Sequence, residues 1–219
     1  MTKSVPDGGF SILLGGVGGQ GLVMLSNIIG KACAETGARV ITGEQHGLSQ
    51  RSGTISVHLR IGESVRSPLI PVGSGDALLS LEALEALRYV EYLKDGGIVL
   101  ANNRIMHPVS ETGEMVKDKS KQYFGTKDVE SRLREVTSSV LFIDALGLAA
   151  QAGNPIAENM VMLGALGVLE QFPVPPEALR DAIVGVVPPG AREANIRAFA
   201  LGAKAARDGF CSTVACRKI

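Results

Sequence analysis

A glycine-rich turn near the start of the chain is the first group of residues that could bind a ligand. Gly16, Gly18 and Gly21 follow the pattern G-x-G-x-x-G, and Gly19 adds a fourth glycine. The turn follows an apolar run typical of a buried strand and opens an amphipathic run typical of a helix. Free N–H groups at such a helix start favour a phosphate or a carboxylate. A dinucleotide site is therefore one interpretation, and a tight turn used only for packing is the other.

Two further residues bear on the dinucleotide interpretation. Glu44 follows the turn at about the 20-residue distance at which nucleotide sites carry an acid for the ribose hydroxyl. Gln20 argues the other way, because it places an amide inside the turn where a small or apolar residue is usual. We also expect positive φ at Gly18 and Gly19, where a Cβ would cost about 1–2 kcal/mol.

A polar segment over residues 43–53 is the second candidate. It contains Glu44, His46, Ser49, Gln50 and Arg51. Arg51 is permanently charged and could clamp a carboxylate or a phosphate, while His46 could move protons. A solvated surface loop, in which Glu44 and Arg51 pair with each other, is the simpler alternative.

Histidine and cysteine are too sparse and too scattered to predict a metal centre. His46 and His58 lack a recognised ligand spacing, and we expect His58 to be structural. Three cysteines are too few for an iron–sulfur cluster, which usually takes four thiolates. We expect Cys33 to be a small buried residue. Cys211 and Cys216 are expected to lie in a loose tail, with a redox pair as the alternative.

The elements that position these residues alternate between strands and helices. That pattern predicts one α/β domain over residues 1–219 with a mostly parallel sheet, and residues 1–9 are expected to be flexible. Residues 54–61 alternate apolar and polar side chains, which indicates a half-exposed antiparallel strand at an edge. The other strands are expected at 10–15, 38–42, 76–80, 98–101 and 138–144, with helices at 19–37, 81–93, 144–153, 155–171, 175–186 and 191–208.

In such sheets, ligands collect outside the carboxyl ends of the strands. The rule brings five distant segments to one edge: residues 15–21, 43–53, 81–85, 102–104 and 144–147.

Composition limits the partners, because 22 basic and 22 acidic residues cancel and leave no broad positive field for nucleic acid. No targeting signal or membrane span is visible, so we expect a cytoplasmic protein without membrane contact.

The combination of motifs resembles a known family. The turn Gly16–Gly21, the segment Gly43-Glu-Gln-His-Gly-Leu-Ser-Gln-Arg-Ser-Gly53 and the strand Val57-His-Leu-Arg-Ile61 are similar to the gamma-type subunits of 2-oxoacid:ferredoxin oxidoreductases, above all to the indolepyruvate branch. The likeness continues to Asn195-Ile-Arg-Ala-Phe199 and implies a Rossmann-like sheet with helices on both faces. Gln45, Leu48 and Ser52 depart from residues common in the family and leave the particular oxoacid open.

The resemblance implies a role in oxidative decarboxylation. The family complexes convert an aryl 2-oxoacid and coenzyme A to an acyl-CoA and pass two electrons to ferredoxin. Thiamine diphosphate and iron–sulfur clusters are expected in a companion alpha subunit, with no cofactor on this chain, which should be inactive alone. The glycine turn and the polar segment would then face substrate, coenzyme A or the partner. A free-standing NAD(P)-binding oxidoreductase and a non-catalytic adaptor remain the alternatives.

Overall fold

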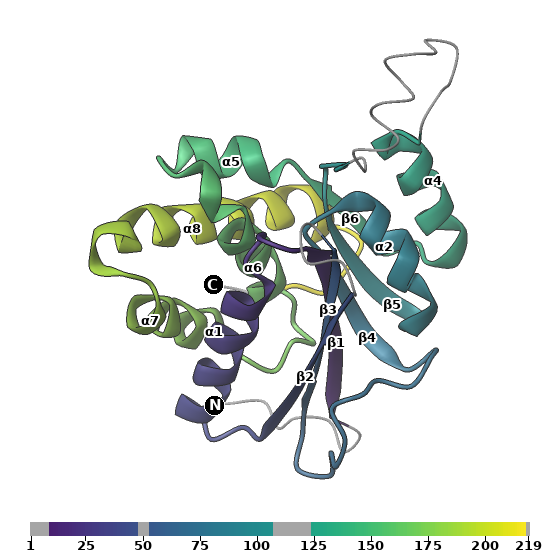
Figure 1. Cartoon of the computed structure of the whole chain (residues 1–219), viewed down its shortest axis with the longest axis horizontal. Helices are drawn as coiled ribbons and strands as arrows, with labels where there is room; N and C mark the ends of the chain where they lie inside the picture. The colour runs from purple at the N-terminus through teal and green to yellow at the C-terminus, as the bar shows by residue number, and fades with distance from the viewer. Residues whose placement is uncertain (1–8, 48–52, 107–123, 218–219) are drawn as a thin grey trace.

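The computed structural model of the chain describes residues 9–47, 53–106 and 124–217. Within these ranges a six-stranded sheet runs through the molecule in the order β2-β3-β1-β4-β5-β6 (Figure 1). Strands β1, β4, β5 and β6 are parallel, whereas β3 is antiparallel to both of its neighbours. The strands are β1 (Phe10–Val17), β2 (Val40–His46), β3 (Thr54–Ile61), β4 (Gly75–Ser80), β5 (Leu93–Asn102) and β6 (Val140–Ile143).

Helices cover both faces of this sheet, as expected for the fold class. One face carries α1 (Leu22–Glu35), α6 (Glu158–Gly167), α7 (Pro176–Val186) and α8 (Arg192–Phe210), with α5 (Ala145–Gln151) at its upper rim in Figure 1. The other face carries α2 (Ala83–Tyr89) and α4 (Thr126–Val136). Three short 3₁₀ helices complete the described chain: η1 (Val90–Tyr92), η2 (Pro155–Ala157) and η3 (Pro189–Ala191).

The central strands are apolar on both sides because each side meets a layer of helices. Ile12 and Leu14 of β1 point into the larger core, whereas Leu13 between them points into the smaller core beneath α2 and α4. Successive side chains of a strand point to opposite faces, so a strand that is buried twice reads as a continuous apolar run. This explains why Phe10–Gly15 is easily recognised as a strand.

The antiparallel strand does not lie at the edge. β3 is confirmed as antiparallel over Thr54–Ile61, but β2 forms the edge and β3 lies one position inside it. Consequently β3 is buried on both faces: His58 is only 1% exposed, and its Nδ1 accepts the N–H of Ile70 at 3.1 Å. Burial lowers the pKa of this imidazole. The polar residues of β3 therefore do not mark a solvent-exposed face, since His58 contacts the segment around Ile70 that covers it.

Two other expectations need correction, and one helix was not predicted. β2 runs on to His46, so the first part of the predicted polar loop is strand. α4 was not predicted, because only Val129 and Leu133 of this charged helix are buried. The C-terminal tail is held in place, since Cys211 and Cys216 form a disulfide.

Helices α6 and α8 cross in direct backbone contact through two glycines. A Cβ built on Gly202 of α8 would lie 1.8 Å from the carbonyl oxygen of Val161, and one on Gly164 of α6 would lie 2.0 Å from that of Phe199. Neither backbone can yield without separating the helices. By contrast, a Cβ on Gly30 of α1 meets no atom within 4 Å.

We therefore predict opposite effects for two glycine-to-alanine substitutions. Gly202→Ala should lower the free energy of unfolding by about 1–3 kcal/mol, because the added methyl overpacks the crossing. Gly30→Ala should raise it by about 0.5–1 kcal/mol, because alanine loses less backbone entropy in a helix. Urea unfolding monitored by circular dichroism measures both. Equal stability of the two variants would mean that the close crossing does not exist.

Candidate functional site

The glycine turn is held together by the side chain of Gln20. Its Oε1 accepts the N–H of Val17 at 2.8 Å, and its Nε2 donates to the carbonyl of Leu81, beyond the end of β4, at 2.9 Å. A Cβ on Gly16 would lie 2.7 Å from the same Oε1. The absence of a side chain at Gly16 thus leaves room for the Gln20 amide, which has a structural role in the turn.

The rest of the turn supports the start of α1. Gly19 and Gly21 have φ of 95° and 83°, the left-handed region that favours glycine, whereas Gly18 does not share it. The positive φ expected at Gly18 is therefore found at Gly21 instead. Asn159 of α6 donates to the carbonyl of Gly21 at 3.4 Å, and a Cβ on Gly21 would lie 2.5 Å from that amide nitrogen.

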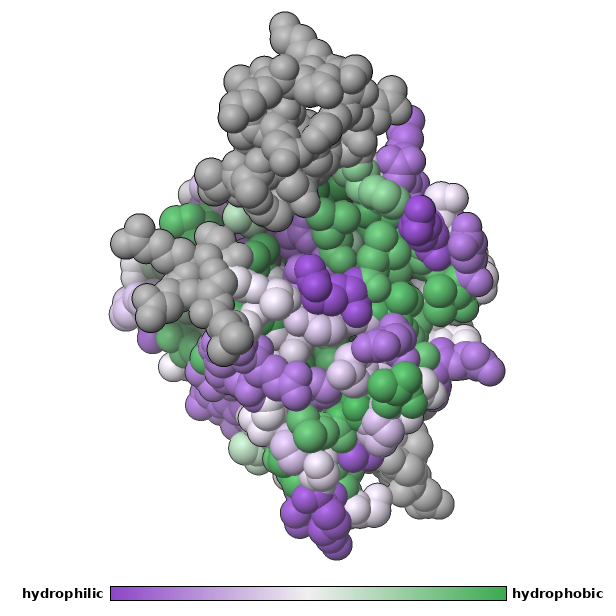
Figure 2. Space-filling model, turned by 45° about the vertical axis from the view of Figure 1, so that its right-hand side comes forward, coloured by the Kyte–Doolittle hydropathy of each residue, from purple (hydrophilic) through white to green (hydrophobic). Residues whose placement is uncertain are grey.

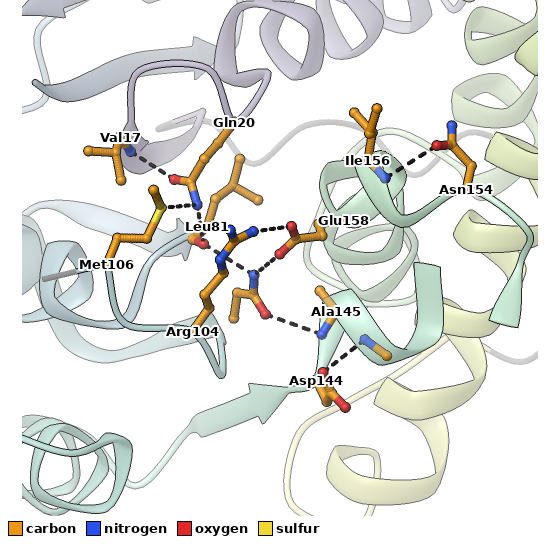
Figure 3. A network of polar contacts seen from close by, with 12 residues as sticks. Val17, Gln20, Leu81, Arg104, Met106, Asp144, Ala145, Asn154, Ile156 and Glu158 are labelled. Carbon is orange, nitrogen blue, oxygen red and sulfur yellow. Dashed lines mark hydrogen bonds and ion pairs between the residues drawn. The ribbon is translucent and has the colours of Figure 1, made fainter. Parts of the chain in front are cut away.

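The carbonyl of Leu81 joins several elements at the carboxyl edge of the sheet. It accepts from Gln20 and also from the Nδ2 of Asn102, at 3.2 Å (Figure 3). Asn102, at the end of β5, is 1% exposed. Its Oδ1 accepts the N–H of Ala145 at the start of α5, and its Nδ2 donates to Glu158 at the start of α6, at 2.7 Å. Two neutral amides thus connect β1, β4 and β5 with two helix starts.

Charges at this edge are paired within the chain. Arg104 forms an ion pair with Glu158, which also accepts from Asn102. Glu82 caps α2 by accepting the N–H of Glu85 at 2.8 Å and also accepts the N–H of Met106 at 2.9 Å. Burial raises the pKa of the Glu82 carboxyl, and the two accepted N–H groups act against that rise. These side chains stabilise the edge.

A cavity of about 380 Å³ opens between these elements. The glycine turn forms one wall and the start of α6 the other, and apolar side chains surround its mouth. Ile156, Leu146 and Met106 are 84%, 42% and 36% exposed. The residues that line it are Gly18, Gly19, Gln20, Leu81, Arg104, Met106, Leu146, Pro155, Ile156 and Glu158.

The predicted site residues divide into three groups. Gly18, Gly19 and Gln20 line the cavity, and Gly16 and Gly21 belong to the same turn. Glu44 and His46 lie on the edge strand β2, exposed and paired with each other at 3.2 Å. The remaining three, Ser49, Gln50 and Arg51, lie outside the described residues.

The described ends of the polar segment lie beside the glycine turn. Gly18 donates its N–H to the carbonyl of Gly53 at 2.9 Å. The hydroxyl of Thr54 contacts the buried carboxylate of Glu85 and, at 2.8 Å, the hydroxyl of Tyr89. The polar segment was expected to lie beside the glycine turn, and its last residue, Gly53, does so.

Several lining residues were not predicted individually. Arg104 and Leu146 lie in segments expected at the carboxyl edge, and the strand-end rule supplied that signal. Met106, Ile156 and Glu158 carry no local motif, since a methionine after a strand and an exposed isoleucine after a proline are common in loops. Asp144 and Asn154 cap α5 and η2 by accepting the N–H groups of Gly147 and Ile156.

Two classes of site find no counterpart among residues 9–47, 53–106 and 124–217. No group of three or more His, Cys, Asp and Glu side chains is arranged to hold a metal ion there. Within the same ranges, no helix combines the length and the apolar character that crossing a lipid bilayer requires.

We predict that Asn102→Asp destabilises the protein, because the oxygen that replaces Nδ2 would face both the Leu81 carbonyl and the Glu158 carboxylate with no hydrogen to donate. The free energy of unfolding should fall by about 2–4 kcal/mol at pH 7, measured by urea unfolding. The matched control is Asn103→Asp, which adds the same charge at the exposed neighbouring side chain and should stay within about 0.5 kcal/mol of the parent. Similar losses in both variants would contradict the role of Asn102.

Comparison with known proteins places the chain in a family. A family model described as pyruvate ferredoxin/flavodoxin oxidoreductase matches residues 11–205. Indolepyruvate oxidoreductase subunit IorB of Thermococcus kodakarensis is 38% identical over 91% of this chain and 96% of its own length, and that of Pyrococcus horikoshii is 39% identical over the same shares. The gamma subunit of the keto/oxoacid ferredoxin oxidoreductase from Geobacter sulfurreducens superposes with a TM-score of 0.66, at 25% identity, over 91% of this chain and 99% of that chain. The resemblance deduced from the glycine turn and the polar segment is confirmed: this chain belongs to the pyruvate ferredoxin/flavodoxin oxidoreductase family.

Proposed function

We propose that this chain is the cofactor-free subunit of a thiamine-diphosphate-dependent oxidoreductase that decarboxylates an aryl 2-oxoacid such as indolepyruvate. The complex would transfer the acyl group to coenzyme A and two electrons to ferredoxin. Relatives that are 36–39% identical are named indolepyruvate oxidoreductase subunits, whereas the 2-oxoglutarate synthase subunits that match are 27–28% identical. This difference supports an aryl oxoacid. We also propose that the chain forms a single domain and acts in the cytoplasm.

The cavity at the carboxyl edge carries this proposal, because its charged groups are already engaged within the chain. Arg104 pairs with Glu158, and Glu82 accepts two backbone N–H groups. A proton-transfer site needs a titratable group that can reach a substrate atom. A cavity whose charged side chains are paired with each other and whose mouth is apolar is better suited to packing against another protein that holds the cofactor.

The cysteines support an assignment of the clusters to the partner. Cys211 and Cys216 are bonded to each other, and Cys33 is completely buried among apolar side chains of the larger core. An iron–sulfur cluster usually needs four Cys thiolates, and one bonded pair with a single further thiol does not fit. Thiamine diphosphate in the partner would accept the electron pair released on decarboxylation, and this chain's own residues would shape the surface beside it.

The free-standing dinucleotide enzyme is the weaker alternative. Gln20 uses the N–H of Val17 and lies over Gly16, so the turn is already occupied by a side chain. Titration with NADH distinguishes the two, because a binding isotherm with the isolated chain would favour the dinucleotide enzyme.

Exposed apolar side chains mark the surface that we assign to the companion subunit. Ile156, Leu146 and Met106 surround the cavity. On another face, Phe124 lies just before α4 and Val136 is its last residue, and Figure 2 shows hydrophobic groups exposed among the charged ones on the side of the molecule that this view brings forward. Exposed apolar side chains that gather at one place, as around the cavity, commonly mark protein contacts.

We predict that Ile156→Glu prevents productive assembly. When co-purified with its alpha subunit, the parent chain should support reduction of ferredoxin by indolepyruvate and coenzyme A, whereas the isolated chain should show none. Ile156→Glu should lower the activity at fixed subunit concentrations at least about tenfold, because a buried unpaired carboxylate opposes docking.

The control is Val72→Glu. Val72 is 65% exposed. Its neighbour Pro71 lines a separate cavity beside the start of β1, at the end of the sheet opposite the candidate site. This variant should assemble and react like the parent. Activity of the isolated chain would refute the subunit role, whereas equal behaviour of the two variants would refute only the docking surface.

Arg51 is proposed as the anion-binding residue of the polar segment. Its guest would be a phosphate of coenzyme A, the carboxylate of the oxoacid or a carboxylate of the partner. For a small guest, Arg51→Lys should raise one Michaelis constant about tenfold, because lysine keeps the charge but loses the bidentate fork. For a carboxylate of the partner, Arg51→Ala should weaken assembly instead. Changes below about twofold in both assays would make Arg51 a solvated loop residue.

A further inference from the structure

The residues after α8 are bound to the turn that follows α6. Leu169 and Cys216 form an antiparallel bridge. On either side of it, Glu170 donates its N–H to the carbonyl of Ala215 at 3.0 Å, and Arg217 donates its N–H to the carbonyl of Val168 at 2.8 Å. The described end of the chain therefore continues the hydrogen bonding of the fold.

The side chain of Arg217 strengthens this attachment. Its guanidinium donates to the carbonyls of Leu169 and Phe172. Phe172 is completely buried and packs edge-to-face against Phe10 of β1, with ring centroids 5.6 Å apart. The segment 211–217 thus covers one end of the larger core, into which Val214 and Cys216 also pack.

A disulfide fastens this segment. Cys211 directly follows the last residue of α8, and its sulfur is bonded to that of Cys216, the residue in the bridge to Leu169. Both cysteines are partly exposed, and Ser212, Thr213 and Ala215 between them are exposed. An external thiol can therefore reach the bond.

Cys33 provides a contrast within the same chain. It is completely buried on α1, and burial raises the pKa of its thiol to about 12. Because the thiolate is the reactive form, Cys33 should stay inert in the folded protein. The chain thus contains one inert thiol and one accessible bonded pair.

We propose that Cys211 and Cys216 form a reversible thiol–disulfide exchange site, whose oxidation state decides whether segment 211–217 stays docked on the turn after α6. The co-substrate is a dithiol, either small or carried by a protein. Its thiolate attacks one sulfur of the bond and forms a mixed disulfide, while the other cysteine leaves as a thiolate. The second thiol of the reductant resolves the intermediate. Two electrons and two protons pass to the pair, and the reductant becomes a disulfide.

The proposed compartment favours reversibility. In a reducing cytoplasm, a persistent structural disulfide is unusual, and those that form there are mostly transient or redox-sensing. Loss of the bond would leave the segment held by the bridge, the backbone hydrogen bonds, Arg217 and the packing of Val214 and Cys216. A short segment with exposed residues and few buried contacts opens more easily than the core does.

Labelling of the full-length chain tests the exchange site. After equilibration with oxidised dithiothreitol, iodoacetamide without denaturant should add no carbamidomethyl group, as measured by intact-mass spectrometry. After equilibration with reduced dithiothreitol it should add two, and peptide mapping should place them on Cys211 and Cys216. Reoxidation should restore protection. Two groups on the oxidised sample, or none on the reduced sample, would overturn the proposal.

Hydrogen exchange tests the docking. In the reduced chain, the amides of Glu170 and Arg217 should exchange about tenfold faster or more than in the oxidised chain, while amides within α6 keep their rates. Cys216→Ser should exchange like the reduced form in both buffers. Cys33→Ala is the matched control and should retain the difference between oxidised and reduced states. Equal exchange of Glu170 and Arg217 in both states of the parent chain would show that the bond does not control docking.

Discussion

The arrangement of the carboxyl edge depends on one buried carbonyl, that of Leu81. The residue lies just beyond β4 and is 1% exposed, so its carbonyl must find donors within the protein. Gln20 and Asn102 supply them from the ends of the two neighbouring parallel strands. Because Asn102 also binds the starts of α5 and α6, satisfying this one acceptor sets the spacing of the glycine turn, the strand ends and the helices around the cavity.

The donors are neutral amides, and this choice has an electrostatic reason. A charged donor at the position of Asn102, which is 1% exposed, would have to be desolvated, and the Glu158 carboxylate that could offset this cost is already paired with Arg104. An amide satisfies a carbonyl without that cost and can accept a second bond with its oxygen. Gln20 and Asn102 both do so, from Val17 and Ala145.

Most of the fold could be predicted from periodicity, because β1, β4 and β5 are apolar runs between recognisable turns. The order of β2 and β3 could not, since it depends on the segment around Ile70 that buries His58. At the site, the glycine turn and the strand-end rule indicated the correct edge. The contribution of Glu158 depends on how α6 packs, which no local pattern records. The pairing of Cys211 and Cys216 was only the alternative to a loose tail, because their spacing fits both until the bridge to Leu169 is seen.

The glycine crossing gives α6 a mechanical property. A contact between backbones has no side-chain rotamers to absorb a displacement, so α6 and α8 behave as one stiff body. The ten residues of α6 span about 15 Å at the usual helical rise. One end of this rod carries Glu158 in the wall of the cavity, and the other leads into the turn on which the C-terminal segment lies. We therefore expect a displacement at either end to reach the other as a tilt of the whole helix pair.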